Sequence, residues 1–303
     1  MSWRNLIISN PAKLYCRDGA LVVRQDYDYR VPLEDISSII IDNPQVILTQ
    51  PVLSKAADYG IAIFSTDSSH TPNGIFLPFI QYNASLKILN LQLNCPKPVL
   101  KRLRSAIVSA KIHNQSQCLK LNNLDGYDFI DMLSKKVRSG DPDNIEARAA
   151  FHYFKYLFGD DFVRYEESSN INACLNYGYA VIRGEIARRL VGHGLHPPLG
   201  IFHCNQKNSF NLADDLMEPF RPIVDIFTFQ YLSISNTEFT LPKAQLVNLL
   251  NFEVSMPEGN MSISLATEYE IESYIRVLKD SSNKISLPSI LKFAKHEFEE
   301  SLC

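Results

Sequence analysis

One histidine and three carboxylates lie close together in residues 200–222 of this 303-residue chain. His203 precedes a short segment that carries Asp214, Asp215 and Glu218. Asp215 and Glu218 are three positions apart, which places them on one face of a helix. An imidazole and carboxylates that converge on one point are a typical environment for a divalent cation. The segment therefore indicates a metal site.

The neighbours of these residues favour a partly buried site. Four apolar residues would bury part of the segment: Leu212, Leu216, Met217 and Phe220. Buried acids need a partner, and a metal ion can supply it. Pro219 follows Glu218 and should push it out of helical geometry, which would re-aim its side chain. Cys204 follows His203, but no second Cys or His pair stands at zinc spacing, which disfavours zinc.

A further acid, Glu146, falls in the first turn of a helix predicted for residues 142–158. Asp141 is the expected N-cap, Pro142 takes the first position, and Gly159 ends the helix. Glu146 lies on the shoulder of the apolar stripe, near the core. An acid in a first turn can also simply stabilise the helix dipole, so its position alone leaves both roles open.

The next predicted helix, 172–191, is apolar over most of its circumference and is expected to be buried. Asn172, Asn176 and Arg183 form one narrow polar stripe along it. Such a stripe needs a polar partner, for which a phosphate path or acidic side chains would serve. A structural pair between Arg183 and a buried carboxylate is the alternative.

The elements around these residues change character along the chain. Short runs of Val, Ile and Leu, separated by turn signals, predict strands at 6–9, 20–24, 38–42, 45–49, 61–65 and 75–79. One helix, 51–59, is predicted between two of these strands. From residue 97 the periodicity becomes helical, beginning with a helix over 98–113.

We therefore predict an α+β protein. A β-rich N-terminal domain with one short helix should cover 1–80, followed by a linker over 81–96. A larger all-helical domain, 97–303, should carry the site.

Composition indicates a globular protein without a membrane partner. The chain is 46% hydrophobic and 21% charged, and no apolar run approaches the roughly 20 residues needed to span a bilayer. Six scattered cysteines without a CxxC pair, and no signal peptide, favour a cytoplasmic location. The net charge of −3 argues against non-specific coating of nucleic acid. Two basic clusters are solvated helix faces or local DNA-binding surfaces: Lys97, Lys101, Arg102, Arg104 and Lys111, and then Lys135, Lys136 and Arg138.

No motif marks a nucleotide loop or an activated protein nucleophile. The patterns GxGxxG, GxxxxGK and GxSxG are absent from the sequence. If the protein is an enzyme, its nucleophile should come from water or substrate, activated by a metal that the acids and the histidine bind.

Three ordered segments, 170–179, 194–203 and 214–222, resemble the CRISPR-associated adaptation integrases, which insert new spacers into CRISPR arrays. The resemblance covers nearly the whole chain, and its form is most similar to that from systems with a single large effector nuclease. It implies an N-terminal β domain for dimerisation and an all-helical catalytic domain. The implied ligands of Mg²⁺ or Mn²⁺ are Glu146, His203 and Glu218, and Asp215 is a further catalytic residue that tunes the site.

The implied reaction is a transesterification in which the 3′-hydroxyl of a short DNA duplex attacks a phosphodiester at the edge of a CRISPR repeat. The implied DNA-binding residues are Asn172, Asn176, Arg183, Lys207, Arg221, Tyr165 and Tyr177. Double-stranded DNA, as spacer precursor and as repeat, is the implied substrate. The implied protein partners are a second copy of the chain and a small adaptation protein that bridges two dimers. The effector nuclease is a further candidate.

Two alternatives remain open. A structure-specific nuclease acting on branched DNA could use the same metal site, with water as the attacker. A non-catalytic DNA-binding scaffold is the second alternative, but its clustered acids would repel DNA phosphates unless they were neutralised.

Overall fold

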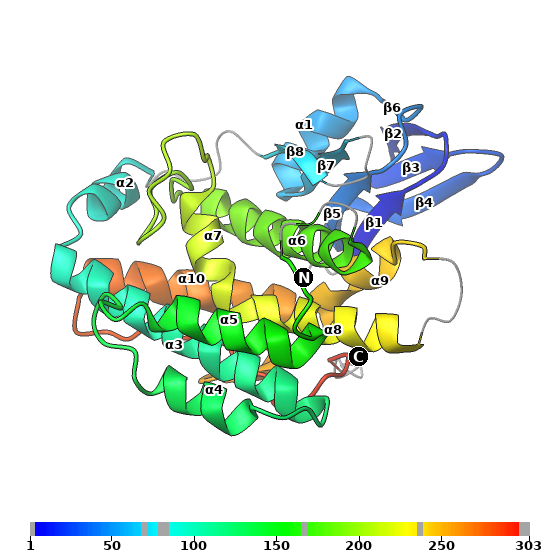
Figure 1. Cartoon of the computed structure of the whole chain (residues 1–303). Helices are drawn as coiled ribbons and strands as arrows, with labels where there is room; N and C mark the ends of the chain where they lie inside the picture. Colours follow the sequence, from blue (N-terminus) through cyan, green and yellow to red (C-terminus); the bar gives the residue numbers. More distant parts are fainter. Residues whose placement is uncertain are drawn as a thin grey trace.

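The computed structural model describes residues 4–67, 72–77, 85–164, 166, 169–234 and 239–296. In these residues a β-rich N-terminal part sits against a larger, mostly helical part (Figure 1). The predicted α+β fold class is therefore confirmed.

The sheet nearest the helices contains β1 (Arg4–Ile8), β5 (Ile36–Ile41), β7 (Ala62–Thr66) and β8 (Pro72–Phe76), in the order β1-β5-β7-β8. The first three are parallel, and β8 runs antiparallel to β7. A run of isoleucines and serines makes β5 buried over most of its length, as expected for a central strand covered on both faces.

A second sheet has the order β4-β3-β2-β6. Its strands are β2 (Lys13–Arg17), β3 (Ala20–Arg24), β4 (Asp28–Pro32) and β6 (Ile47–Leu48). Asp18 and Gly19 join β2 to β3 with φ values of 49° and 74°, which suit a tight hairpin turn. The sequence did not predict β2 and β4, because their mixed polar composition hides the strand signal. The η1 turn (Leu33–Asp35) follows β4, and helix α1 (Gln50–Tyr59) separates β6 from β7, as predicted.

The rest of the chain is mostly helical. Its helices are α2 (Ser85–Leu93), α3 (Lys97–Leu121), α4 (Tyr127–Ser134), α5 (Ile145–Phe158), α6 (Asn170–Gly192), α7 (Asn211–Met217), α8 (Arg221–Ile234), α9 (Lys243–Asn248) and α10 (Ile263–Lys279), with the 3₁₀ turns η2 (Glu218–Phe220) and η3 (Leu249–Asn251). One antiparallel hairpin, β9 (Glu253–Met256) and β10 (Gly259–Ser262), interrupts the part that we expected to be all helical. The predicted linker 81–96 contains α2, and its residues 81–84 lie outside the described part.

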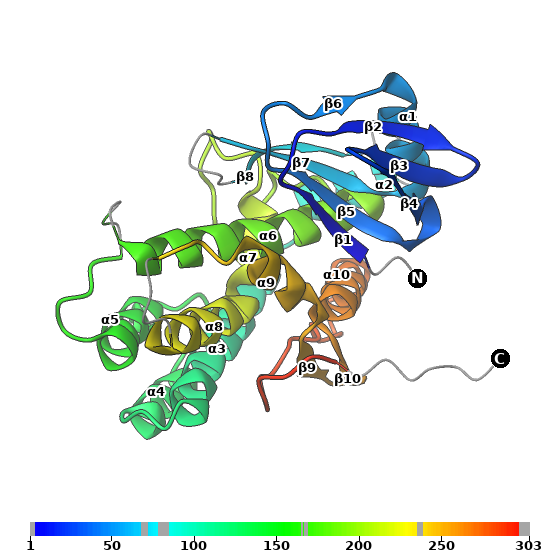
Figure 2. The same ribbon diagram turned by 90° about the vertical axis from the view of Figure 1, so that its right-hand side faces the viewer.

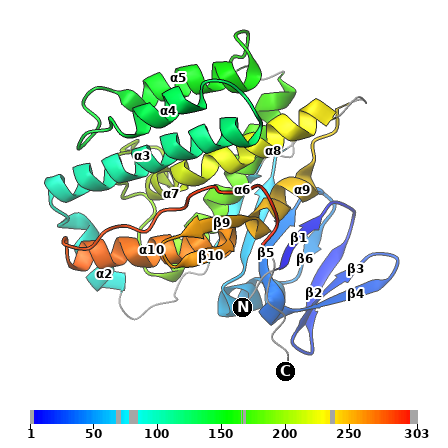
Figure 3. The same ribbon diagram turned by 90° about the horizontal axis from the view of Figure 1, so that it is seen from below.

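Two long helices organise this part. Helix α3 packs against α4, α5, α8 and η2 (Figure 3). Helix α6 lies between these helices and the N-terminal sheet, against β7 and β8 (Figure 2). Gly184 of α6 makes this approach possible, because a Cβ there would lie 2.1 Å from the ring of Phe64. Phe64, Ala62 and Ile40 consequently belong to the main helical core.

Among the described residues, no helix combines the length and the apolar composition that a membrane span requires.

Candidate metal centre

Glu218 lies at a break between two helices. The chain passes from α7 through the single 3₁₀ turn η2 into α8. Glu218 itself has φ −52° and ψ −43°, so the expectation that Pro219 drives it out of helical geometry is wrong. Pro219 lacks a backbone donor, and the break appears instead as a change from α-helical to 3₁₀ geometry.

Asn114 of α3 holds this turn through a side-chain hydrogen bond to its backbone. Its side-chain amide donates to the carbonyl of Pro219 at 2.7 Å and to that of Pro288 at 3.0 Å, and its oxygen accepts from the backbone of Ile290. Asn114 is fully buried. The amide thus fixes the backbone directly after Glu218, a role that the sequence did not reveal because its partners are distant in the chain.

Glu146 reaches the site from α5. The helix begins at Ile145, three positions later than the predicted start at Pro142. The N-cap residue is Asn144, so the prediction that Asp141 is the N-cap is wrong. Asp141 nevertheless serves the start of the helix, because its carboxylate accepts the backbone N–H groups of Ile145 at 2.9 Å and Glu146 at 3.1 Å. These hydrogen bonds set the first turn and hence the direction of the Glu146 side chain.

Lys111 of α3 joins the two acids. Its Nζ lies 2.7 Å from Oε1 of Glu146 and 2.6 Å from Oε2 of Glu218. The interpretation of Lys111 as part of a DNA-binding surface cluster is wrong, since its side chain is only 14% exposed. A signal was present in the sequence: Lys111 stands four positions after the buried Ile107, on the apolar stripe of the helix.

The surrounding cations keep Glu218 ionised. Burial raises its pKa, but the charges of Arg221 and Lys111 lower it more, to about 2. Arg221 Nε donates to Oε1 of Glu218 at 2.9 Å. Glu218 can therefore offer a charged carboxylate although its side chain is only 5% exposed.

Asp215 orients His203. Its Oδ1 lies 2.6 Å from Nδ1 of the imidazole and accepts the backbone N–H of His203 at 3.1 Å. Its Oδ2 accepts the backbone N–H groups of Ile201 and Phe202. Because an ionised carboxylate can only accept, Nδ1 carries the proton and Nε2 keeps its lone pair for a ligand. The bond to Asp215 also raises the pKa of His203.

Gly200 allows the loop to close tightly around Asp215. A Cβ at this position would lie 2.2 Å from the carbonyl oxygen of His203 and 2.9 Å from Oδ2 of Asp215. Since backbone cannot give way as a flexible side chain can, any larger residue would displace the His203 loop.

The donor set suits a divalent cation. The ammonium of Lys111 already stands as a cation between Glu146 and Glu218, and the charge of Glu218 raises the pKa of the nearby His203. Two carboxylates and one imidazole nitrogen are ligands that Mg²⁺ and, more readily, Mn²⁺ accept. Both carboxylate oxygens of Asp215 are bound to the His203 loop, so Asp215 is a positioning residue here.

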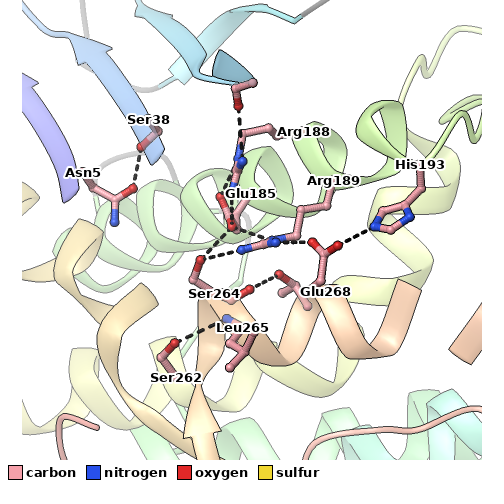
Figure 4. Close-up of polar contacts among 12 residues, drawn as sticks. Asn5, Ser38, Glu185, Arg188, Arg189, His193, Ser262, Ser264, Leu265 and Glu268 are labelled. Atoms are coloured by element: carbon pink, nitrogen blue, oxygen red, sulfur yellow. Dashed lines mark hydrogen bonds and ion pairs between the residues drawn. The ribbon is translucent and has the colours of Figure 1, made fainter. Parts of the chain in front are cut away.

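A different trio has the shortest mutual distances. Among the described residues, His193, Glu268 and Glu272 are the one set of three whose ligand atoms all lie within 4.8 Å of one another. The ligand atoms of the predicted set, Glu146, His203 and Glu218, are therefore farther apart. Arg189 and His193 already bind Glu268, and Arg189 also pairs with Glu185 (Figure 4). The guanidinium supplies the positive charge there, which indicates an ion-pair network that ties α6 to α10.

Four of the predicted DNA-binding residues keep accessible polar groups. Asn176 and Lys207 are exposed. Arg183 is 39% exposed and lies 3.9 Å from Asp214. The side chain of Arg221 is 25% exposed, but its guanidinium is bound to Glu218. We therefore assign Arg221 to the metal centre rather than to the DNA-binding surface.

The other three lie elsewhere. Asn172 is buried, and its amide nitrogen donates to the carbonyls of Val163 and Glu166, so it holds the loop before α6. Tyr177 is fully buried, which corrects the expectation that its ring stacks on a DNA end. Tyr165 lies outside the described residues.

Arg104 of α3 lies beside the His203 loop. Its guanidinium lies 5.4 Å from the ring of Phe202, the neighbour of His203. Its buried Nε has no hydrogen-bond partner among the described residues. Most other members of the two basic clusters are exposed: Lys97, Lys101, Arg102, Lys135, Lys136 and Arg138.

Comparisons with known proteins identify the family of this chain. Residues 6–241 match the family described as CRISPR associated protein Cas1. The chain is 37% identical to a CRISPR-associated endonuclease Cas1 of Neisseria meningitidis over 99% of this chain and 100% of the relative. It is 30% identical to one from Saccharolobus solfataricus, over 77% of this chain and 76% of the relative.

Solved structures show the same fold at low sequence identity. A casposase bound to integration product has a TM-score of 0.76 at 19% identity and covers 93% of this chain and 92% of its own. A CAS1 protein from Thermotoga maritima has a TM-score of 0.68 at 16% identity and covers 97% of this chain and 100% of its own. Together with the family match over most of its length, these similarities show that the chain belongs to the Cas1 family of CRISPR-associated, metal-dependent endonucleases and integrases, which insert spacers.

Proposed function

We propose that this chain joins the 3′-hydroxyl of a short DNA duplex to a CRISPR repeat at a centre built from Glu146, His203 and Glu218, with Mg²⁺ or Mn²⁺ as the bound ion. The observation that carries the proposal is the cation between two carboxylates beside an imidazole whose Nε2 has no partner among the described residues. When bound, the ion would lower the pKa of the attacking hydroxyl and neutralise charge on the phosphate.

The residues around the ligands have distinct roles in this proposal. Asp215 holds the imidazole of His203 in one tautomer and one orientation. Arg221 keeps the Glu218 carboxylate charged and fixed. Arg104, Arg183, Lys207 and Asn176 would contact DNA phosphates, because each has a partly or fully exposed polar side chain near the His203 loop or on α6.

The N-terminal region is the proposed dimerisation domain, with its boundary near residue 80. Two large aromatic residues support this, because Tyr27, in the turn before β4, is 76% exposed and Tyr29, on β4, is 56% exposed. We also propose a small adaptation protein as the bridge between two dimers. A solved Cas6-RT-Cas1–Cas2 complex, whose fold matches 92% of this chain with a TM-score of 0.71, supports a second protein as a partner.

The motif form supports an origin in a system with a single large effector nuclease, which would be a further partner. A pull-down of that effector with the purified chain would test the association.

The function is tested by strand transfer of a labelled duplex with free 3′-hydroxyls into a repeat-containing plasmid, in the presence of Mn²⁺. His203→Ala and Glu218→Ala should abolish joining while circular dichroism and plasmid binding persist. Glu272→Ala, on the exposed face of α10, is the matched control and should join normally. Joining by both site variants would overturn the proposal.

The same assay distinguishes the integrase from the second candidate function, a structure-specific nuclease. Water would compete with the 3′-hydroxyl for the same phosphodiester at the same metal centre. Plasmid cutting without joined product would favour a structure-specific nuclease acting on branched DNA.

A further inference from the structure

The ammonium group of Lys111 lies between two carboxylates, a position that suits a cation. It reaches from α3 to Glu146 on α5 and to Glu218 on η2, within 2.7 Å of one oxygen of each. These two acids are the proposed carboxylate ligands of the metal ion. An ammonium and a divalent ion cannot both take the same carboxylate lone pairs, so the two cations compete.

The two acids depend on Lys111 to different degrees. Glu218 has a second cationic partner in Arg221, at 2.9 Å. For Glu146, Lys111 is the one side-chain partner within the described part of the chain. Withdrawing Lys111 would leave two partly buried carboxylates close together, with Arg221 bound to Glu218 and no described side-chain partner for Glu146, an arrangement that favours a new cation.

We propose that Lys111 is an internal competitor of the metal ion. It neutralises and holds together Glu146 and Glu218 when no ion is bound, and it must leave at least one of them when the ion enters. This inference rests on the proposed function, because it assumes that Glu146 and Glu218 are ligands. Lys111 thus lowers the affinity of the chain for the ion. By neutralising the two acids, it also stabilises the metal-free protein.

The test measures metal affinity rather than activity. Mn²⁺ binding to the full chain is followed by the electron paramagnetic resonance signal of free Mn²⁺. Lys111→Met removes the charge, and Lys111→Gln removes it but keeps a hydrogen-bond donor. Both variants should bind Mn²⁺ about tenfold more tightly, or better, because a competing positive charge has been removed from the site. Without Mn²⁺ both should melt at a lower temperature than the parent, and Mn²⁺ should raise their melting temperature by more.

The controls separate this inference from the metal site itself. Lys120→Met, an exposed lysine on the same helix, should leave the Mn²⁺ affinity unchanged. Glu218→Gln should weaken binding if the proposed ligands are right. Unchanged or weaker binding by the Lys111 variants, together with a loss of binding in Glu218→Gln, would overturn the competitor role alone. Unchanged binding in Glu218→Gln would overturn the ligand assignment and the competitor role together.

Discussion

The imidazole Nδ1 of His203 lies 2.6 Å from Oδ1 of Asp215, and the same carboxylate accepts three consecutive backbone N–H groups of the loop that carries this histidine. Asp215 is fully buried, whereas the His203 side chain is 43% exposed. One carboxylate therefore fixes both the loop and the ring, and leaves the lone pair of Nε2 available for a ligand.

Asp215→Asn should disturb the site without removing a proposed ligand. The amide has one acceptor oxygen in place of two, so part of the loop loses its partner and the ring loses its fixed tautomer. We expect Mn²⁺ affinity or strand transfer to fall about 10–100-fold. Mn²⁺ titration and the transfer assay measure this. Asp214→Asn is the matched control and should change both values less. Equal effects of the two changes would contradict the positioning role.

Asp225 should make stability depend on pH. Tyr153 and Tyr179 both donate to its buried carboxyl group. Burial nevertheless raises its pKa to about 6. An acid whose pKa is raised on folding contributes its full stability when the pH is below its pKa in the unfolded chain. This stability is lost as the pH rises through the folded-state pKa of about 6. Above that pH, the ionised group costs about 3 kcal/mol of folding free energy.

Asp225→Asn removes this titration. Relative to the parent, the variant should gain about 2 kcal/mol between pH 4.5 and pH 7.5, and little beyond. Urea unfolding of both proteins across this range measures the difference. A constant difference at every pH would show that the pKa of Asp225 is not raised.

Arg104→Ala should weaken DNA binding without affecting the metal ion. The side chain of Arg104 is partly exposed beside Phe202, so its guanidinium would bind a phosphate close to the His203 loop. Loss of one phosphate contact should lower the slope of log affinity against log salt by about 1. Filter binding at several salt concentrations gives the slope. Lys155→Ala, exposed on α5, should leave the slope unchanged, and an equal change in both would refute the assignment.

Asn114→Ala should destabilise the fold around Glu218. The change leaves the carbonyls of Pro219 and Pro288 and the N–H of Ile290 without their partner in a buried place. Each unsatisfied group costs about 1–3 kcal/mol, so we expect a loss of about 3 kcal/mol of unfolding free energy. Denaturant titration measures it. A loss below about 1 kcal/mol would mean that water replaces the amide.

Local pattern was enough to predict several helices, including most of the two that precede the His203 loop. Helix α5 and the greater part of α6 follow from apolar periodicity and capping residues, and α1 follows from Pro51 and Gly60. These signals act over a few residues, so a sequence displays them directly. The roles of Glu146, His203 and Glu218 came from the resemblance to the family, and their ligand assignment stays a prediction.

The sequence by itself determined the α+β class, helix α1, most of α5 and α6, and the types of donor available to a cation, because these depend on neighbours in the chain. Only the tertiary structure decided which charges meet. It placed Lys111 between Glu146 and Glu218, gave the oxygens of Asp215 to the His203 loop and buried Tyr177 completely. Burial and ion pairing depend on how distant helices pack, and α3, α5 and η2 meet only in the folded chain.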